Sequence, residues 1–311
     1  MSGAPHVRIL MCTCNGAPWL EAQLASFVAQ THGAWSLWVS DDGSTDATRS
    51  LLEAFDRARP GRIERIVEGP RAGSAANYMH LLCHPDLPPG PVALSDQDDV
   101  WMADKLARAI AALGGPRAAD SAAQPAAWGA RWIVTDEHLS NPRPSTRFPR
   151  GPSFGNALVQ NVLSGHSATL NAAALALVRR AGPQPVAHHD WWLYQLLAGS
   201  GADLVLDEAP ALYYRQHGRN VLGANRGWSA MLARLGQVRG GSFTDWTRTH
   251  RVALGRVAPL LTPAARGLLA ALDAAPPRGL GRIRAFRRLG LVRQTRTGTA
   301  LLHLLAGQGR I

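Results

Sequence analysis

Three carboxylates fall within four positions at the end of a short apolar run: Asp96, Asp98 and Asp99. The apolar run, residues 92–94, predicts a buried strand, and ligands of open α/β sheets bind at the carboxyl ends of the strands. Clustered carboxylates repel one another unless a cation neutralises them, and Mg²⁺ is usually held by one or two carboxylates plus substrate phosphates. The Asp96-x-Asp98 pair therefore predicts a metal site that holds a nucleotide diphosphate. The alternative is an acidic turn in which Asp99 or Asp104 caps the next helix.

Alternating strands and helices lead up to this cluster and must position it. Apolar runs predict strands at 7–12, 35–40, 62–67 and 92–94, and apolar residues at helical spacing predict the helices between them. This alternation is typical of an α/β fold, a doubly wound and mostly parallel sheet flanked by helices. Beyond the cluster, strands are expected at 128–135, 165–171 and 204–206, and helices at 172–180 and 188–198.

Composition indicates a globular protein of one large or two ordinary domains, because 311 residues with 46% hydrophobic side chains can bury a sizeable core. No run of about 18 uncharged apolar residues occurs, so no spanning helix is expected. The N-terminus shows no signal-peptide pattern. The three cysteines, Cys12, Cys14 and Cys83, lack zinc spacing and are odd in number, which favours a reduced, cytoplasmic protein.

The net charge of +11 is unevenly distributed along the chain. Residues 225–311 carry 15 arginines and two acidic residues, a net charge of +13, whereas residues 1–224 carry −2. We therefore predict two regions, a domain at 1–224 and a basic, helical extension at 225–311. One function to consider for the arginine-rich region is binding of nucleic acid. It is disfavoured because this region shows no binding motif and only four Trp or Phe residues.

Arginines and apolar residues alternate near the C-terminus in a pattern that predicts an amphipathic helix. The arginines are Arg282, Arg284, Arg287, Arg288, Arg293 and Arg296, and the apolar residues are Ile283, Phe286, Leu289, Leu291 and Val292. Such a helix lies in a membrane interface and is attracted to anionic lipid. The alternatives are that these helices pack on the domain at 1–224 with a solvated basic face, or that they form a homodimer interface.

Six short motifs occur in the order found in family 2 glycosyltransferases. They are Thr13-Cys14-Asn15-Gly16, Asp41-Asp42-Gly43-Ser44-Thr45-Asp46, Gly73-x3-Asn77, Ser95-Asp96-Gln97-Asp98-Asp99-Val100-Trp101, His189-Asp190-Trp191-Trp192 and Tyr214-Arg215-Gln216-His217. Over about residues 7–222 the chain resembles the bacterial rhamnosyltransferase-like branch of this family. The resemblance implies a GT-A fold and inverting transfer of a sugar, with rhamnose as one candidate, from a UDP- or dTDP-sugar. The acceptor would be a glycan or a lipid-linked glycan of a bacterial surface polysaccharide, at the inner face of the cytoplasmic membrane.

The resemblance also implies roles for the donor-site residues. Asp41, with Asp42 as second choice, would accept a hydrogen bond from the N3–H of a pyrimidine base. Asp96 would lie near the ribose and the metal, and Asp98 would bind Mn²⁺ or Mg²⁺ directly. His217 would complete the metal or diphosphate site, although a plain surface histidine is the alternative. The remaining donor residues would be Thr13, Asn15, Gly73 and Asn77.

Asp190 matches the catalytic base of the family, which removes the proton of the acceptor hydroxyl as that oxygen attacks the anomeric carbon. Trp191 and Trp192 would stack against a sugar, and Gly165 and His166 would line the sugar or acceptor site. The alternative for Asp190 is an ordinary helix cap in front of a tryptophan-rich core face.

Overall fold

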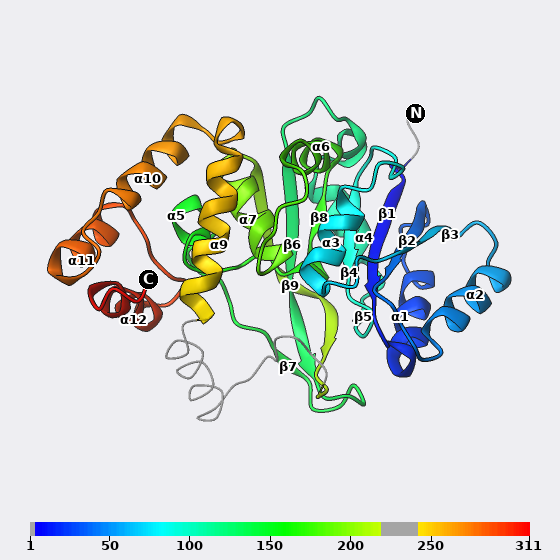
Figure 1. Ribbon diagram of the computed structural model, residues 1–311. Coiled ribbons are helices and arrows are strands. Elements are labelled where there is room, and N and C mark those ends of the chain that lie inside the picture. Colours follow the sequence, from blue (N-terminus) through cyan, green and yellow to red (C-terminus); the bar gives the residue numbers. More distant parts are fainter. Residues whose placement is uncertain (1–3, 219–241) are drawn as a thin grey trace.

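A nine-stranded mixed sheet runs through the molecule, with helices on both faces (Figure 1). The computed structural model describes residues 4–218 and 242–311. Its first half contains four parallel strands in the order β3-β2-β1-β4, and all four were predicted. These strands are β1 (Val7–Thr13), β2 (Trp35–Asp41), β3 (Ile63–Glu68) and β4 (Val92–Ser95). Their carboxyl ends meet at one edge of the sheet, where the acidic motifs follow β2 and β4.

The second half of the sheet is mixed. Its strands are β5 (Val100–Trp101), β6 (Ala126–Thr135), β7 (Arg143–Pro144), β8 (Thr169–Leu170) and β9 (Asp203–Arg215). β8 joins β4 to β6 with antiparallel pairing, and β9 runs parallel to β6. The expected strand at 165–171 is only two residues long because Gly165–Ser167 forms a 3₁₀ turn, η2. The expected strand at 204–206 is the start of the much longer β9, whose pairing with β6 is interrupted by register shifts.

The strand alternation of β1 explains how the helices divide between the two faces. Val7, Ile9 and Met11 pack with one hydrophobic cluster, and Leu10 packs with the other. The first cluster includes residues of α1 (Ala17–Val28), α2 (Thr48–Ala58) and α4 (Lys105–Ala112). The second includes residues of α3 (Ser74–Leu82), α5 (Phe154–Ala157), α6 (Ala172–Ala181) and α7 (His189–Gly199). Two further short 3₁₀ helices are η1 (Gly115–Ala119) and η3 (Ala258–Leu260).

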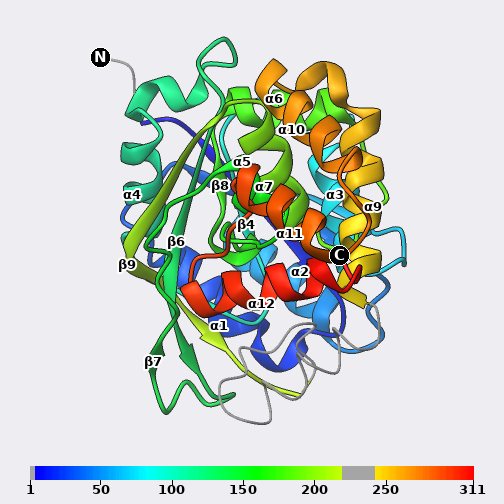
Figure 2. The same cartoon turned by 90° about the vertical axis from the view of Figure 1, so that its left-hand side faces the viewer.

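Four C-terminal helices lie beside α5 and α7, on the side away from β3 (Figures 1 and 2). They are α9 (Ser242–Arg256), α10 (Pro263–Asp273), α11 (Gly279–Arg288) and α12 (Arg296–Gly307). Their apolar residues share one core cluster with Trp191 and Trp192 of α7. Phe286 and Leu291, which we expected to face a membrane, are only 2% and 0% exposed. The structure corrects that expectation in favour of packing on the α/β part, because burying these side chains against α7 removes apolar surface from water.

The predicted boundary between residues 224 and 225 lies outside the described residues. Among the helices that the structure describes, none combines the length and apolar composition needed to cross a membrane.

Candidate active site

The loop after β4 is fixed to the loop after β1 by a side chain that lies between the acidic residues. Gln97 accepts a hydrogen bond from the backbone N–H of Cys14 at 2.9 Å and donates one to the Cys14 carbonyl at 3.0 Å. Sequence reasoning assigned Gln97 no role beyond its place in the motif. Its two bonds hold the acidic loop against the start of the donor region.

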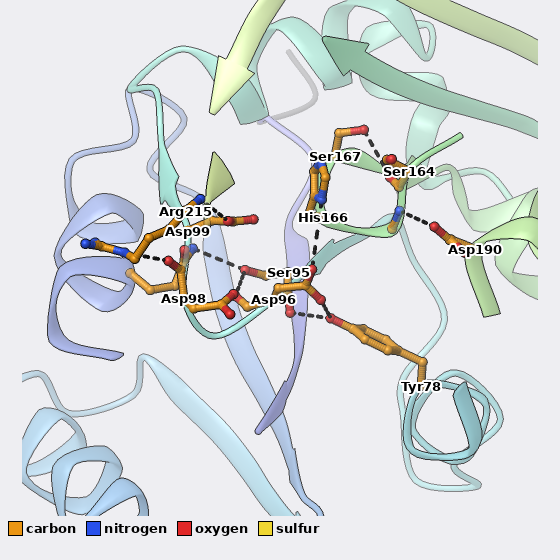
Figure 3. Close-up of polar contacts among 12 residues, drawn as sticks. Tyr78, Ser95, Asp96, Asp98, Asp99, Ser164, His166, Ser167, Asp190 and Arg215 are labelled. Carbon is orange, nitrogen blue, oxygen red and sulfur yellow. Dashed lines mark hydrogen bonds and ion pairs between the residues drawn. The ribbon is translucent and has the colours of Figure 1, made fainter. Parts of the chain in front are cut away.

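Asp96 lies at the centre of the acidic loop, with its side chain 36% exposed (Figure 3). The Tyr78 hydroxyl lies 2.9 Å from Asp96 Oδ1 and also donates to the Ser95 carbonyl. Burial, followed by the nearby charge of Asp98, raises the pKa of Asp96 to about 7. A carboxyl group that resists ionisation in this way is stabilised as the anion when a cation binds next to it. Sequence reasoning missed Tyr78, although it directly follows the motif residue Asn77.

Asp98 contacts the last motif of the α/β part. Its Oδ2 atom lies 2.8 Å from His217 Nε2, and its backbone carbonyl accepts a hydrogen bond from Arg215 Nε at 2.9 Å. The His217 ring stacks on Trp19 of α1, with centroids 3.6 Å apart and planes only 9° from parallel. His217 is therefore a structured part of the site and not a plain surface histidine. A cavity of about 740 Å³ opens beside it, lined in part by Trp19, Arg215 and His217.

The donor atoms present fit a divalent metal. Carboxylate oxygen and imidazole nitrogen are ligands that Mn²⁺ accepts. Asp98 and His217 offer one of each, 2.8 Å apart, and His217 lines the cavity. A second group, Asp96, Asp99 and His166, brings its candidate ligand atoms within 4.8 Å of one another. Asp99 is fully buried and accepts a hydrogen bond from the Arg215 backbone N–H. We favour Asp98 and His217, because His217 lines the cavity whereas Asp99 is fully buried. Among the described residues, Asp96 groups its carboxylate with Asp99 and His166 and not with this pair.

Asp190 lies in the first turn of α7 and contacts the turn η2. Its Oδ2 atom accepts a hydrogen bond from the Gly165 N–H at 3.2 Å, and Oδ1 accepts one from the Trp191 N–H at 2.7 Å. An anionic side chain is stabilised at this position by the helix dipole. The carboxylate is partly exposed, and two hydrogen bonds leave lone pairs for an acceptor hydroxyl. Asp190 thus has both a fixed orientation and the capacity to take a proton.

The structure corrects the prediction that Trp191 and Trp192 stack against a sugar. Their side chains are 5% and 0% exposed, and the Trp191 indole N–H donates to the Ala157 carbonyl. Successive residues of a helix are rotated by about 100°, so Asp190 faces the site while both tryptophans turn into the core. Trp191 contacts His250 of α9, which anchors the catalytic helix to the C-terminal helices.

His166 and His189 are buried walls of the site. Burial lowers the pKa of His166 to about 3 and that of His189 to about 4, so both rings are neutral at physiological pH. The His189 ring stacks on Tyr78, with centroids 3.8 Å apart, and thereby joins the acidic loop to the catalytic helix. His166 Nδ1 lies 3.9 Å from Asp96 Oδ2. Sequence reasoning placed His166 at the sugar or acceptor site.

Several expected donor-site residues are buried behind the surface they were predicted to form. Asp41 is fully buried, and its carboxylate accepts hydrogen bonds from Thr13 Oγ1, Ser44 Oγ and the Ser44 N–H at 2.6–3.0 Å. Asn77 is 1% exposed and bonds to Ser40 with both amide atoms. Asp41, Thr13 and Asn77 therefore shape the loops after β1 and β2.

The exposed part of the predicted donor site is formed by Asn15, Asp42 and Gly73. Asn15 accepts a hydrogen bond from the Thr45 N–H at 2.8 Å and so ties the loop after β1 to the loop after β2. The carboxylate of Asp42 accepts hydrogen bonds from the backbone N–H groups of Arg71 and Gly73. Asn15, Asp42 and Gly73 are partly or fully exposed, so of the predicted donor residues in these loops they are the ones at the surface.

Gly165 is a position where one added methyl group is expected to reduce catalysis. A Cβ atom there would lie 2.6 Å from His189 Nε2 and 3.3 Å from Asp190 Cβ. Gly165→Ala should therefore displace the Asp190 carboxylate, which the family resemblance makes the expected base, and lower turnover by about 10²-fold, the cost of a misplacement near 1 Å. Gly33→Ala is the matched control, because a Cβ at Gly33 meets no atom within 4 Å. Equal rates for the two variants would show that Gly165 does not govern the position of Asp190.

Comparisons with known proteins place this geometry in a family. The family model described as Glycosyl transferase family 2 matches residues 8–176. The dTDP-rhamnosyl transferase RfbG of Shigella flexneri is 30% identical over 234 residues, which is 74% of this chain and 79% of that protein. The UDP-Glc:alpha-D-GlcNAc-diphosphoundecaprenol beta-1,3-glucosyltransferase WfgD of Escherichia coli is 33% identical over 102 residues, 32% of this chain and 38% of that protein.

Solved structures share the fold. S. aureus TarS 1–349 in complex with UDP-GlcNAc superposes with a TM-score of 0.54 at 13% identity, covering 98% of this chain and 92% of that one. The mannosyltransferase PcManGT of Pyrobaculum calidifontis, in complex with GDP-Man and Mn²⁺, gives a TM-score of 0.52 at 20% identity, covering 98% and 84%. The predicted GT-A fold is thereby confirmed, and the family match extends over more than half of the chain. This protein belongs to glycosyl transferase family 2, and it is a glycosyltransferase.

Proposed function

We propose that this enzyme transfers a sugar from a dTDP- or UDP-sugar to a hydroxyl group of a glycan or lipid-linked acceptor, with inversion at the anomeric carbon. The arrangement around Asp96 carries the proposal. In Figure 3 Asp98 and Arg215 lie on one side of Asp96, and the turn at His166 with Asp190 lies on the other. A donor whose diphosphate lies at Asp98 and His217 would direct its sugar towards Asp190.

In this arrangement Asp190 takes the proton of the acceptor hydroxyl while that oxygen bonds to the anomeric carbon and the bond to the diphosphate breaks. A bound divalent cation would supply Lewis-acid stabilisation of the departing diphosphate, and Asp98, His217 and Asp96 would hold it. The loops that would face the nucleotide base are fixed by hydrogen bonds of Asp41, Thr13 and Asn15. His166 and His189 exclude water from the space between donor and acceptor.

The named relatives support the choice of substrates. RfbG is a dTDP-rhamnosyl transferase, and WfgD uses UDP-Glc and an acceptor linked to diphosphoundecaprenol. Rhamnose from a dTDP-sugar is therefore our first candidate for the donor, and a lipid-linked glycan of a bacterial surface polysaccharide is our first candidate for the acceptor.

Donor choice can be tested by thermal unfolding with UDP, dTDP and GDP, each with Mn²⁺ or with EDTA. We expect UDP and dTDP to raise the melting temperature more than GDP, because Asp41 offers an acceptor to the N3–H that both pyrimidine bases carry. Asp41 is buried, so the loop carrying Ser44 must move for direct contact. Stabilisation by GDP alone would refute the assignment of a pyrimidine donor.

We also propose that the enzyme works at the inner face of the cytoplasmic membrane, where a lipid-linked acceptor is held. The support lies in side chains other than the buried Phe286 and Leu291. Leu280 of α11 and Leu304 of α12 are 70% and 55% exposed, and exposed arginines such as Arg287 and Arg288 lie on α11. Apolar groups together with basic residues favour binding to anionic lipid.

Vesicle flotation of the full chain tests this second proposal. A truncated chain would expose the core shared with α7, so the comparison should use Leu280→Gln combined with Leu304→Gln. We expect the unaltered chain to float with anionic vesicles at low salt and the double variant to float much less. Equal flotation of both proteins, or of neither, would contradict the proposal. A change in oligomeric state caused by the double variant would instead indicate a homodimer interface.

A further inference from the structure

The single lysine of this chain is fully buried at the start of α4. Lys105 is 0% exposed, and no other lysine occurs in the sequence. Burial of an ammonium group is costly unless hydrogen bonds and opposite charges compensate for it. Its Nζ atom donates to the His166 carbonyl at 2.8 Å and lies 3.2 Å from the centre of the Trp101 ring. Both partners belong to segments that flank the active site.

The charges around Lys105 are those of the acidic loop. Asp99 is also 0% exposed, and its Oδ2 atom has no hydrogen-bond partner among the residues that the structure describes. Burial, the larger effect, lowers the pKa of the Lys105 amine well below its usual value, whereas the charges of Asp99 and Asp96 favour its protonated form. Lys105 is therefore a buried neighbour of the acidic loop. Trp101, in β5 directly after this loop, fixes the ammonium group from a second direction.

The turn that Lys105 contacts also contacts the catalytic base. In η2 (Gly165–Ser167), the His166 carbonyl accepts the hydrogen bond from Lys105, and the neighbouring Gly165 N–H donates to Asp190 Oδ2 at 3.2 Å. A shift of the His166 carbonyl rotates the peptide units beside it, and the Gly165 N–H moves with them. One short turn thus connects the ammonium group to the base.

We propose that Lys105 is a positioning residue for the transfer reaction, which couples the acidic donor loop to Asp190 through the turn Gly165–Ser167. This inference rests on the proposed function of Asp98 and Asp190. Lys105 touches neither the donor nor the acceptor. Its loss is therefore expected to affect turnover more than donor binding.

Lys105→Met tests the proposal, because methionine keeps most of the side-chain length and removes the charge and the donor. We expect the dissociation constant for the nucleotide diphosphate with Mn²⁺ to change by less than about threefold. The rate of sugar transfer at saturating donor should fall by about 10²-fold, the effect of misplacing a reacting group by about 1 Å. Turnover within twofold of the unaltered enzyme would overturn the proposal. An equal loss of donor binding and turnover would also overturn it, because Lys105 would then serve the donor site alone.

A measurement on the unaltered lysine covers the case in which the methionine variant does not fold. Labelling with ¹³C- and ¹⁵N-lysine gives one side-chain ammonium signal, since Lys105 is the only lysine. We expect Asp190→Ala to shift this signal, because it releases the Gly165 N–H and loosens the turn. Asp86→Ala is the control, since Asp86 pairs with Arg65 on the surface. If neither variant shifts the signal, or if both do so equally, Lys105 is not coupled to Asp190.

The kinetics of Lys105→Met and the signal of the labelled lysine also separate this inference from the proposed function. A complete absence of transfer by the unaltered enzyme with every donor would defeat the proposed function. The lysine signal would still decide whether the ammonium group and the Asp190 carboxylate are coupled.

Discussion

Asp190→Asn is expected to bind the donor normally and to transfer its sugar about 10²- to 10⁴-fold more slowly than the unaltered enzyme. The amide has nearly the same shape as the carboxylate but no basic lone pair for the acceptor proton. Nucleotide binding should survive because Asp190 lies across Asp96 from the proposed metal ligand Asp98 (Figure 3). Donor affinity and transfer rate, measured on the same preparation, provide the test.

One structural effect must be separated from loss of the base. The carboxylate of Asp190 accepts hydrogen bonds from both the Gly165 and Trp191 N–H groups, and an amide offers a single oxygen to the two donors. Asp190→Ala removes both bonds and should be no faster than Asp190→Asn. Transfer by Asp190→Asn at near-normal rate would reduce Asp190 to a residue that only stabilises the first turn of α7.

Asp98→Ala is expected to abolish the dependence of nucleotide binding on Mn²⁺ or Mg²⁺. Asp98 Oδ2 lies 2.8 Å from His217 Nε2, and its loss leaves only His217 and Asp96 of the three proposed ligands. Replacing even an outer partner of a metal ligand typically costs about 10- to 100-fold in affinity, so direct loss of the ligand should cost at least as much. Calorimetric titration of UDP or dTDP, with Mn²⁺ and with EDTA, measures the effect.

Asp104→Ala is the matched control, because this carboxylate is exposed and pairs with Arg108 on the surface. It should bind the nucleotide as the unaltered protein does. Equal affinity of Asp98→Ala in EDTA and of the unaltered protein in Mn²⁺ would contradict the assignment of the metal site to Asp98.

The sequence was sufficient for the first half of the fold. Strands β1, β2 and β4 are short apolar runs that are largely buried, so local composition reveals them. The edge strand β3 is partly exposed and mixes apolar with charged residues. The second half was harder to predict. Register shifts between β6 and β9 obscure the alternation of β9, and β8 is a two-residue strand that pairs with distant segments.

The site was predicted in part. The motifs identified Asp98, His217 and Asp190, and the structure shows that Asp98 contacts His217. The pattern could not show which motif residues face the cleft. Asn77 and Asp41 form hydrogen bonds to neighbouring loops. Trp191 and Trp192 turn into a core that they share with α9, a helix about 50 residues further along the chain. Tertiary packing of this kind leaves no local signal in the sequence.

The C-terminal region shows why charge alone misled us. A net charge of +13 over residues 225–311 suggested a separate basic surface. Phe286 and Leu291 instead join the core cluster that also contains residues of α7. Even Arg282 is only 7% exposed, with its guanidinium donating to backbone carbonyls. The comparisons with glycosyltransferases support the enzyme over the nucleic-acid-binding alternative.

Release of the nucleoside diphosphate from dTDP-rhamnose, UDP-glucose and GDP-mannose tests the central claim most directly. The assay should contain Mn²⁺ and a lipid-linked glycan acceptor, with EDTA and Asp190→Asn as parallel reactions. We expect release from a pyrimidine donor that depends on the acceptor, on the metal and on Asp190. Release that continues unchanged in EDTA and in Asp190→Asn, or release from GDP-mannose alone, would contradict a metal-assisted pyrimidine-sugar transferase with Asp190 as its base.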